Sequence, residues 1–257
     1  MSADRAPPWF SEEAGFFGPW YLAEYAQLLP AQRSLQEVDF IERVLALQPG
    51  ARILDVPCGH GRHAVELAGR GYAVTGTDIN GFFLEQAGAT AAGQGVTLSL
   101  QQGDMRALAF DAEFDVVLNL FSSIGYFEDD ADDQKVFDGI ARALVPGGQF
   151  FIDFLNREAL LRNFKPTELR ELPDGTTLLF EREHDLLTGK NIVRRTVTQP
   201  GGKPRRIADV APRQYTTVEI IKMAKAAGLA FRQAWGDFEG GPLTIDSARV
   251  LLVFGKV

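Results

Sequence analysis

Residues 52–80 constrain the fold of this chain more than any other stretch. They open with a short apolar run that contains one carboxylate, Asp55, which is typical of a buried parallel strand. Gly59 and Gly61 then indicate a tight turn at which a ligand can come close to the backbone. A helical pattern and a second β run follow, and the second run ends at Asp78. This order of elements predicts a nucleotide-binding βαβ unit.

The charge of Asp55 distinguishes between nucleotide ligands. A pyrophosphate is anionic and gains nothing from a carboxylate, whereas a cationic tail in a partly desolvated site is attracted to it. Asp78 follows the second strand, where an acid can accept hydrogen bonds from a ribose diol. An adenosine with a positively charged tail and no phosphates is S-adenosylmethionine. A NAD-dependent dehydrogenase stays open as the alternative from another enzyme class, although it would place an anionic cofactor beside Asp55.

The same stretch resembles the class I S-adenosylmethionine-dependent methyltransferases. Their first motif, acid-x-Gly-x-Gly-x-Gly, stands here as Asp55-Val56-Pro57-Cys58-Gly59-His60-Gly61, with a proline in place of the first glycine. The third motif resembles Gly103-Asp104-Met105-Arg106, and the fourth resembles residues 114–126. The resemblance implies that Asp104 contacts the adenine amino group and that the Met105 backbone helps to hold the ring. The cofactor residues we predict are Asp55, Pro57, Gly59, Gly61, Asp78, Ile79, Asp104, Met105 and Leu120.

Alternating helical and β patterns predict an α/β fold. The resemblance implies a Rossmann-like, seven-stranded methyltransferase sheet, mostly parallel, with an antiparallel last strand. Ser34 and Glu37 have the spacing of a capping box and predict the start of the helix before the first strand. Thr216 and Glu219 predict another such box late in the chain, and Asn80 predicts a helix cap.

The stretch after the fifth predicted strand changes character. Turn signals around residues 173–175, 188–190 and 200–202 predict about four antiparallel strands. We therefore predict an inserted antiparallel β lid that roofs the acceptor pocket. The predicted parts are an aromatic-rich N-terminal lid or arm (1–33), a cofactor-binding methyltransferase domain (34–160 and 216–257) and the substrate-covering insert (161–215).

No catalytic residue can be assigned from the sequence. Methyl transfer from a sulfonium is an in-line displacement with a good leaving group, so the protein mainly has to align the reacting atoms. An acceptor amine need only be unprotonated, whereas a hydroxyl would need a general base. The candidates for acceptor contact are Tyr21, Tyr25, Phe121, Tyr126, Asp153 and Tyr215. Each of the aromatic rings could instead be a core residue.

Composition limits the partners. The net charge of −8 disfavours a nucleic-acid acceptor, because an acidic chain lacks the positive field that attracts phosphates. No apolar run approaches the roughly 18 residues that span a bilayer. The N-terminus has no hydrophobic signal core, and a single cysteine fits a reducing compartment, so we expect a cytoplasmic protein. No His/Cys cluster has metal-ligand spacing, so we expect no metal.

These features predict S-adenosylmethionine-dependent methyl transfer to a nitrogen or oxygen of a small molecule, catalysed mainly by proximity and orientation. An RNA or protein methyltransferase is the alternative, and it would use the basic residues at 194–195 and 203–206. A module that binds the cofactor without catalysis also stays open. The sequence leaves a homodimer open and does not identify the acceptor.

Overall fold

The structure is a computed structural model that describes residues 10–11 and 15–257. The predicted N-terminal lid therefore lies partly outside the described residues, at 1–9 and 12–14. The chain divides into two compact units. Unit 1 is Met1–Pro30 with Asn163–Gln214, and unit 2 is Ala31–Arg162 with Tyr215–Val257.

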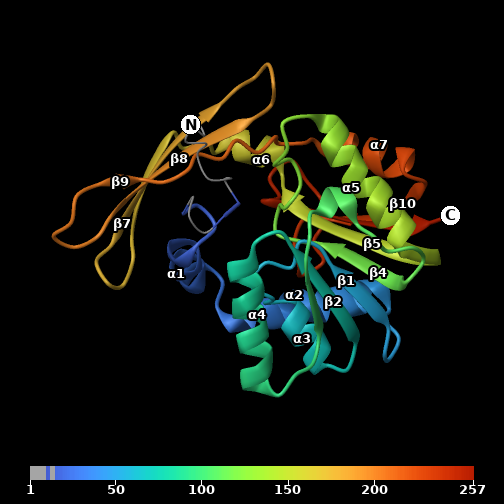
Figure 1. Cartoon of the computed structure of the whole chain (residues 1–257). Helices are drawn as coiled ribbons and strands as arrows, with labels where there is room; N and C mark the ends of the chain where they lie inside the picture. The colour runs from blue at the N-terminus through green and yellow to red at the C-terminus, as the bar shows by residue number, and fades with distance from the viewer. Residues whose placement is uncertain (1–9, 12–14) are drawn as a thin grey trace, which may run out of the picture. The chain divides into compact units, whose positions relative to one another are not determined.

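Unit 2 contains a seven-stranded sheet with the strand order β10-β11-β5-β4-β1-β2-β3. The β1 to β5 pairings are parallel, and β11 runs antiparallel to both β5 and β10 (Figure 1). The predicted α/β class and the antiparallel last strand are therefore confirmed. The strands are β1 (Arg52–Asp55), β2 (Ala73–Asp78), β3 (Ser99–Gln102), β4 (Phe114–Asn119), β5 (Leu144–Leu155), β10 (Leu229–Trp235) and β11 (Arg249–Lys256).

Helices cover both faces of this sheet because alternate strand residues point to opposite sides. Leu54 of β1 packs in the core that α5 and α7 close, whereas its neighbour Ile53 packs in the core under α2 and α3. Figure 1 shows α5 and α7 on one side and α2, α3 and α4 on the other. The helices are α2 (Ala31–Leu45), α3 (Ala64–Gly69), α4 (Gly81–Gln94), the 3-10 turn η1 (Met105–Ala107), α5 (Asp130–Ala143), α6 (Arg157–Arg162) and α7 (Thr217–Ala226).

Two of the three predicted helix caps are confirmed. Thr216 and Glu219 form a reciprocal capping box at α7, and the Asn80 side chain accepts the Phe83 N–H at the start of α4. The capping box predicted at Ser34 and Glu37 is wrong, because α2 already begins at Ala31. Both side chains are buried there, and both hydrogen-bond Arg62 instead.

Unit 1 contains a four-stranded antiparallel sheet with the order β6-β7-β8-β9. The three predicted turn signals fall between its successive strands, so the inserted antiparallel sheet is confirmed. Its role as a lid stays a prediction. The elements of this unit are α1 (Pro19–Leu28), β6 (Thr167–Glu171), β7 (Thr177–His184), β8 (Asn191–Thr198) and β9 (Arg205–Arg206).

Helix α1 is held on this sheet by a buried charge. Arg195 of β8 is 2% exposed and lies between the rings of Phe16 and Phe180, with centroids 4.4 and 4.8 Å from its guanidinium carbon. It pairs with Glu24 of α1 at 3.3 Å, and Glu24 also pairs with Arg170 of β6.

Across the described residues, no helix has both the length and the apolar character that a membrane crossing requires.

Candidate functional site

Four of the predicted cofactor and acceptor residues lie at one edge of the unit 2 sheet. Asp55 ends β1 and Asp78 ends β2, and these strands run parallel to each other. Leu120 directly follows β4, and Asp153 lies near the end of β5. Because the carboxyl ends of parallel strands share one edge, these four residues belong to the edge at which open α/β sheets bind ligands.

Asp55 is a buried carboxyl group without a hydrogen-bond partner. It is 1% exposed, and neither of its oxygens has a partner among the described residues. Burial raises the pKa of Asp55 to about 8, against the opposing charge of Arg62 and with a further increase from Asp78. A buried carboxylate of this kind is costly unless a cation pairs with it. The site therefore fits a ligand that brings a positive charge.

The loop after β1 leaves space for a ligand. Gly59 has φ +55°, and a Cβ added there would meet no described atom within 4 Å. Gly61 has φ +80°, and a Cβ there would come within 2.7 Å of the Ala87 Cβ on α4. Any side chain at position 61 would therefore collide with α4. At position 59, the absence of a side chain leaves the backbone accessible to a ligand. Pro57, predicted to line the same loop, follows Val56 through a cis peptide bond.

Asp78 fixes the same loop from the neighbouring strand. Its Oδ2 accepts the Gly59 N–H at 2.8 Å, and its Oδ1 accepts the Asn80 N–H at 2.8 Å. Burial raises the pKa of Asp78, although these backbone hydrogen bonds oppose the shift. These backbone hydrogen bonds use only part of the acceptor capacity of a carboxylate, which offers about four lone-pair positions, so Asp78 can still accept from a ribose. The next residue, Ile79, accepts a hydrogen bond from Gln102 through its carbonyl oxygen.

Asp104 precedes the short η1 turn and is engaged by Arg106. Its Oδ1 accepts the Arg106 N–H at 2.9 Å, and its Oδ2 pairs with the Arg106 guanidinium at 2.6 Å. Partial burial raises the pKa of Asp104, but the hydrogen bonds and charge of Arg106 outweigh it and hold that pKa below its ordinary value. Arg106 also pairs with Asp132 of α5, so this acid is held in place before any ligand binds. Met105, whose backbone we predict beside the adenine, begins the η1 turn.

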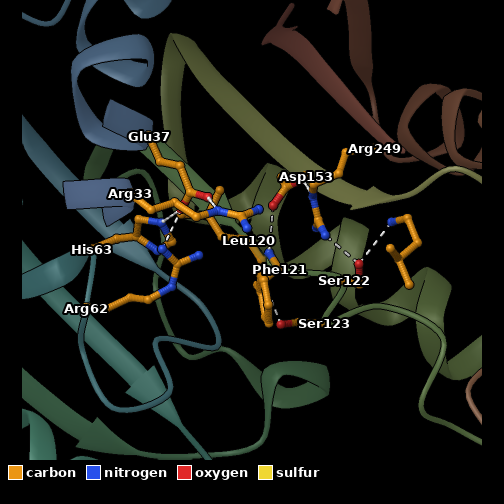
Figure 2. Close-up of polar contacts among 11 residues, drawn as sticks. Arg33, Glu37, Arg62, His63, Leu120, Phe121, Ser122, Ser123, Asp153 and Arg249 are labelled. Carbon is orange, nitrogen blue, oxygen red and sulfur yellow. Dashed lines mark hydrogen bonds and ion pairs between the residues drawn. The ribbon is translucent and has the colours of Figure 1, made fainter. Parts of the chain in front are cut away.

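The turn after β4 carries Leu120 and Phe121. Leu120 is buried, and its carbonyl oxygen accepts the Ser123 hydroxyl at 2.7 Å. Phe121 has φ +62° and Ser122 has φ +61°, both in the left-handed region. Figure 2 shows Phe121 joined to Asp153 by a hydrogen bond.

Asp153 organises this turn from β5. It is 1% exposed, its Oδ2 accepts the Phe121 N–H at 3.0 Å, and its Oδ1 pairs with Arg249 of β11. The Ser122 hydroxyl accepts hydrogen bonds from Arg249 Nη2 at 3.1 Å and from the Leu155 N–H at 2.9 Å (Figure 2). Both Asp153 oxygens are therefore already used within the protein, and its predicted contact with the acceptor stays untested.

A second charged cluster joins α2 to the start of α3. The buried Glu37 accepts from Arg33 at 2.9 Å and His63 at 2.8 Å, and it also pairs with Arg62 (Figure 2). Burial raises the pKa of Glu37, but the His63 hydrogen bond and the charge of Arg62 outweigh it, so that pKa lies well below its ordinary value. Burial lowers the pKa of His63, and it also lowers the pKa of His60 to about 4.

The remaining predicted acceptor residues lie in different places. Tyr215 is 3% exposed, and its hydroxyl lies 2.8 Å from Asp133 and 3.0 Å from Asp130. Tyr126 is half-buried and belongs to the segment after β4. Tyr21 and Tyr25 belong to unit 1, where their ring centroids are 4.2 Å apart. Contact of these four residues with the acceptor stays a prediction.

Sequence reasoning did not find Glu37, Arg62, Ser122 or Arg249 as parts of this edge. A signal for Arg62 was present, because an arginine directly follows the glycine loop. Arg249 carries no such signal, since it meets Ser122 across 127 positions of chain. Within the described part of the chain, no group of three or more His, Cys, Asp or Glu residues could hold a metal ion.

Comparison with known proteins agrees with this geometry. Residues 53–148 match the family model described as "Methyltransferase domain". An uncharacterized protein of Mycobacterium tuberculosis is 32% identical over 163 residues, which cover 60% of this chain and 57% of that protein. The chain therefore spans little more than half the length of this curated relative.

Solved structures share the fold. An S-adenosylmethionine-dependent methyltransferase from Clostridium acetobutylicum has a TM-score of 0.79 at 18% identity, over 92% of this chain and 97% of its own. The amino pentose methyltransferase CalS10 from Micromonospora echinaspora was solved with S-adenosylmethionine bound. It has a TM-score of 0.70 at 21% identity, and the match covers 93% of this chain and 97% of CalS10. Residues 53–148 are therefore similar to a methyltransferase domain, and the chain has the fold of the S-adenosylmethionine-dependent methyltransferases among these solved structures, with the acids that end β1 and β2 at its ligand-binding edge.

Proposed function

We propose that this chain transfers the methyl group of S-adenosylmethionine to a nitrogen or oxygen of a small molecule. The observation that carries the proposal is Asp55, a buried carboxyl group with no partner among the described residues. The positive amino end of the cofactor would supply the missing partner charge. A pyrophosphate would instead place negative charge beside Asp55 and Asp78, so a NAD-dependent dehydrogenase is not supported.

The residues at the sheet edge fit the parts of this cofactor. Asp55 would pair with the amino group, and Asp78 would accept the ribose hydroxyls with its remaining lone pairs. The backbone at Gly59 offers open space, and Asp104 with Met105 would meet the adenine. Leu120 would contribute backbone at the amino-acid end. When bound, the cofactor supplies an electrophilic methyl on a sulfonium sulfur.

The described residues support catalysis by alignment more than by proton transfer. The two histidines near the loop are poor bases, since burial lowers the pKa of His60 to about 4 and His63 is engaged by Glu37. Holding two reactants in line can supply much of a rate enhancement without a base. A neutral amine, or an acceptor hydroxyl of low pKa, fits such a site.

Two observations favour a small acceptor over RNA. The chain is acidic, with a net charge of −8. In the basic hairpins, Arg206 pairs with Asp209 at 3.0 Å and Arg194 pairs with Glu183 at 3.4 Å, so much of the local positive charge is neutralised. An amino pentose is the acceptor named for the structural neighbour CalS10, and amino sugars are therefore the first class to test. The covering of the acceptor by residues 1–33 and 161–215 is part of this proposal.

Calorimetry tests the cofactor directly. We expect S-adenosylhomocysteine to bind the full chain and NADH not to bind, and the reverse result would establish the dehydrogenase alternative. Formation of S-adenosylhomocysteine is then followed with S-adenosylmethionine and a panel of amino sugars, amines and phenols. Binding without turnover on any class of acceptor, including RNA and protein, would support the non-catalytic module instead.

A further inference from the structure

Two consecutive residues of the turn after β4 adopt a backbone conformation that residues other than glycine rarely adopt. Phe121 (φ +62°) and Ser122 (φ +61°) lie in the left-handed region, which glycine adopts without cost and which a bulky residue such as phenylalanine avoids. Such residues persist only where the surrounding structure holds them, and they concentrate at functional sites.

A set of buried contacts from two other strands holds the turn. Asp153 of β5 accepts the Phe121 N–H through its side chain and the Ser122 N–H through its backbone carbonyl, at 3.0 and 2.9 Å. Arg249 of β11 pairs with the Asp153 carboxylate and donates to the Ser122 hydroxyl. The side chain of Arg249 is 13% exposed and that of Asp153 is 1% exposed, so little solvent competes for these contacts.

The Phe121 ring is oriented by two guanidinium groups. The guanidinium carbon of Arg249 is 5.2 Å from the ring centroid and that of Arg62 is 5.1 Å away, both within the range of cation–π contacts. Arg62 is itself fixed by Glu37 and Ser34. The turn and the ring are therefore each held by more than one contact (Figure 2).

We propose that Ser122, Asp153 and Arg249 are positioning residues for methyl transfer. They hold Phe121 in a left-handed conformation, so that this turn presents a fixed wall to the donor end of the cofactor. The proposal rests on the proposed function and names a role for residues at that same site. A role in packing alone explains it poorly, since glycine at these positions would form the same turn without strain. The turn also follows β4, at the edge of the sheet where ligands bind.

Matched substitutions separate the strain from the hydroxyl contact. Ser122→Ala removes the hydroxyl and keeps the strain, whereas Ser122→Gly removes both. Arg249→Met removes the whole contact, and Arg249→Lys keeps the charge without the forked geometry that serves Asp153 and Ser122 together. Ala112→Gly is the control, because Ala112 also has a positive φ (+51°) but lies just before β4, at the opposite end of the strand.

Methyl transfer is measured with the best acceptor of the panel, alongside thermal unfolding and calorimetry with S-adenosylhomocysteine. We expect Ser122→Ala and Arg249→Met to lower kcat about 10- to 100-fold, the scale expected when a reacting group is misplaced. Affinity for S-adenosylhomocysteine should change much less. Ser122→Gly should keep more activity than Ser122→Ala, and Arg249→Lys should recover part of the loss. Ala112→Gly should leave kcat unchanged.

A second readout needs no acceptor. Sinefungin carries an amine on carbon in place of the sulfonium methyl, so its affinity relative to S-adenosylhomocysteine reports the surroundings of the transferred group. We expect this ratio to change in Ser122→Ala and Arg249→Lys, and to stay at the wild-type value in Ala112→Gly. If Arg249→Met does not fold, Ser122→Ala and Arg249→Lys, compared with Ala112→Gly, still test the positioning role.

The two proposals fail in different ways. If the wild-type chain does not bind S-adenosylhomocysteine, the proposed function is wrong. If the wild type binds and transfers, but the Ser122 and Arg249 variants lower only the melting temperature, with kcat and the sinefungin ratio unchanged, the positioning role is overturned. Equal activity of Ser122→Ala and Ser122→Gly would likewise show that the left-handed strain at position 122 has no part in catalysis.

Discussion

The Gly59 N–H donates to Asp78 Oδ2 over 2.8 Å, and this hydrogen bond links the loop after β1 to the acid that ends β2. The parallel pairing of the two strands places Asp55 opposite Gly76, two residues before Asp78. The loop conformation and the proposed ribose site therefore depend on the same carboxylate. A change at Asp78 should affect both cofactor binding and loop stability.

Replacing Asp78 should weaken cofactor binding. Asp78→Ala removes the proposed ribose hydrogen bonds and should cost about 1–3 kcal/mol in S-adenosylhomocysteine binding, measured by calorimetry. Asp78→Asn keeps one acceptor oxygen and should lose less. Asp115→Asn is the control, because Asp115 pairs with Arg52 at the amino ends of the strands. Wild-type affinity in Asp78→Ala would place the ribose elsewhere.

Cofactor binding should release a proton from Asp55. Burial raises the pKa of Asp55 to about 8 in the free protein, so at pH 7 the carboxyl is mostly protonated. A positive amino group at this site favours the carboxylate and lowers that pKa. Calorimetry at pH 7 in buffers of different ionisation enthalpy should therefore show proton release with S-adenosylhomocysteine. Asp55→Asn should abolish the release and weaken binding, and an unchanged proton count would contradict the pairing.

The same group makes the stability of the free protein pH-dependent. Between the unfolded pKa of about 3.9 and the folded pKa of about 8, the folded state keeps a proton that the unfolded state has released. Wild-type stability should thus contain a component that is complete below about pH 4 and is lost as the pH rises towards 8. The side chain of the Asp55→Asn variant cannot titrate. The free energy of unfolding of the variant should therefore rise relative to that of the wild type between pH 5 and pH 8, which urea unfolding at these two pH values would show.

Local patterns in the sequence predicted the parts of this site that lie in one short stretch. The glycine loop and the acid at Asp78 lie in residues 52–80, where period and turn residues act together, and the structure keeps their order. The seven-stranded sheet with its antiparallel last strand followed from the family resemblance. The glycine loop and the position of Asp78 are determined by residues that are close together in the sequence.

Distant contacts could not be predicted in the same way. Ser34 and Glu37 match a capping box, yet both turn inward because Arg62, 25 positions beyond Glu37, offers a largely buried positive charge. The left-handed pair at Phe121 and Ser122 contains no glycine, so no turn signal marks it. Tertiary contacts impose that conformation, and they come from β5 and β11.

Glu37→Gln should destabilise unit 2. Loss of the charge leaves the largely buried guanidinium of Arg62 without its partner, and the cost should approach the roughly 3–5 kcal/mol found for buried pairs. The low pKa of Glu37 means that its contribution is present above the unfolded value of about 4.3 and is lost as the pH falls further. The gap between wild type and variant in urea unfolding should therefore shrink on acidification below pH 4. Glu85→Gln, at an exposed position of α4, is the control and should change little at either pH.

Tyr215→Phe separates an anchoring role from acceptor contact. The hydroxyl is buried against Asp133, which also accepts the Gly125 N–H at 2.9 Å from the segment after β4. Its loss removes a hydrogen bond to a buried carboxylate, and we expect a stability loss of about 1–3 kcal/mol. Tyr72→Phe, whose hydroxyl bonds the partly buried Glu42, is the matched control and should lose less. A raised KM for the acceptor at unchanged S-adenosylhomocysteine affinity would support the acceptor contact predicted from the sequence. A stability loss alone would make Tyr215 an anchor for the segment that carries Phe121, because Asp133 joins the two.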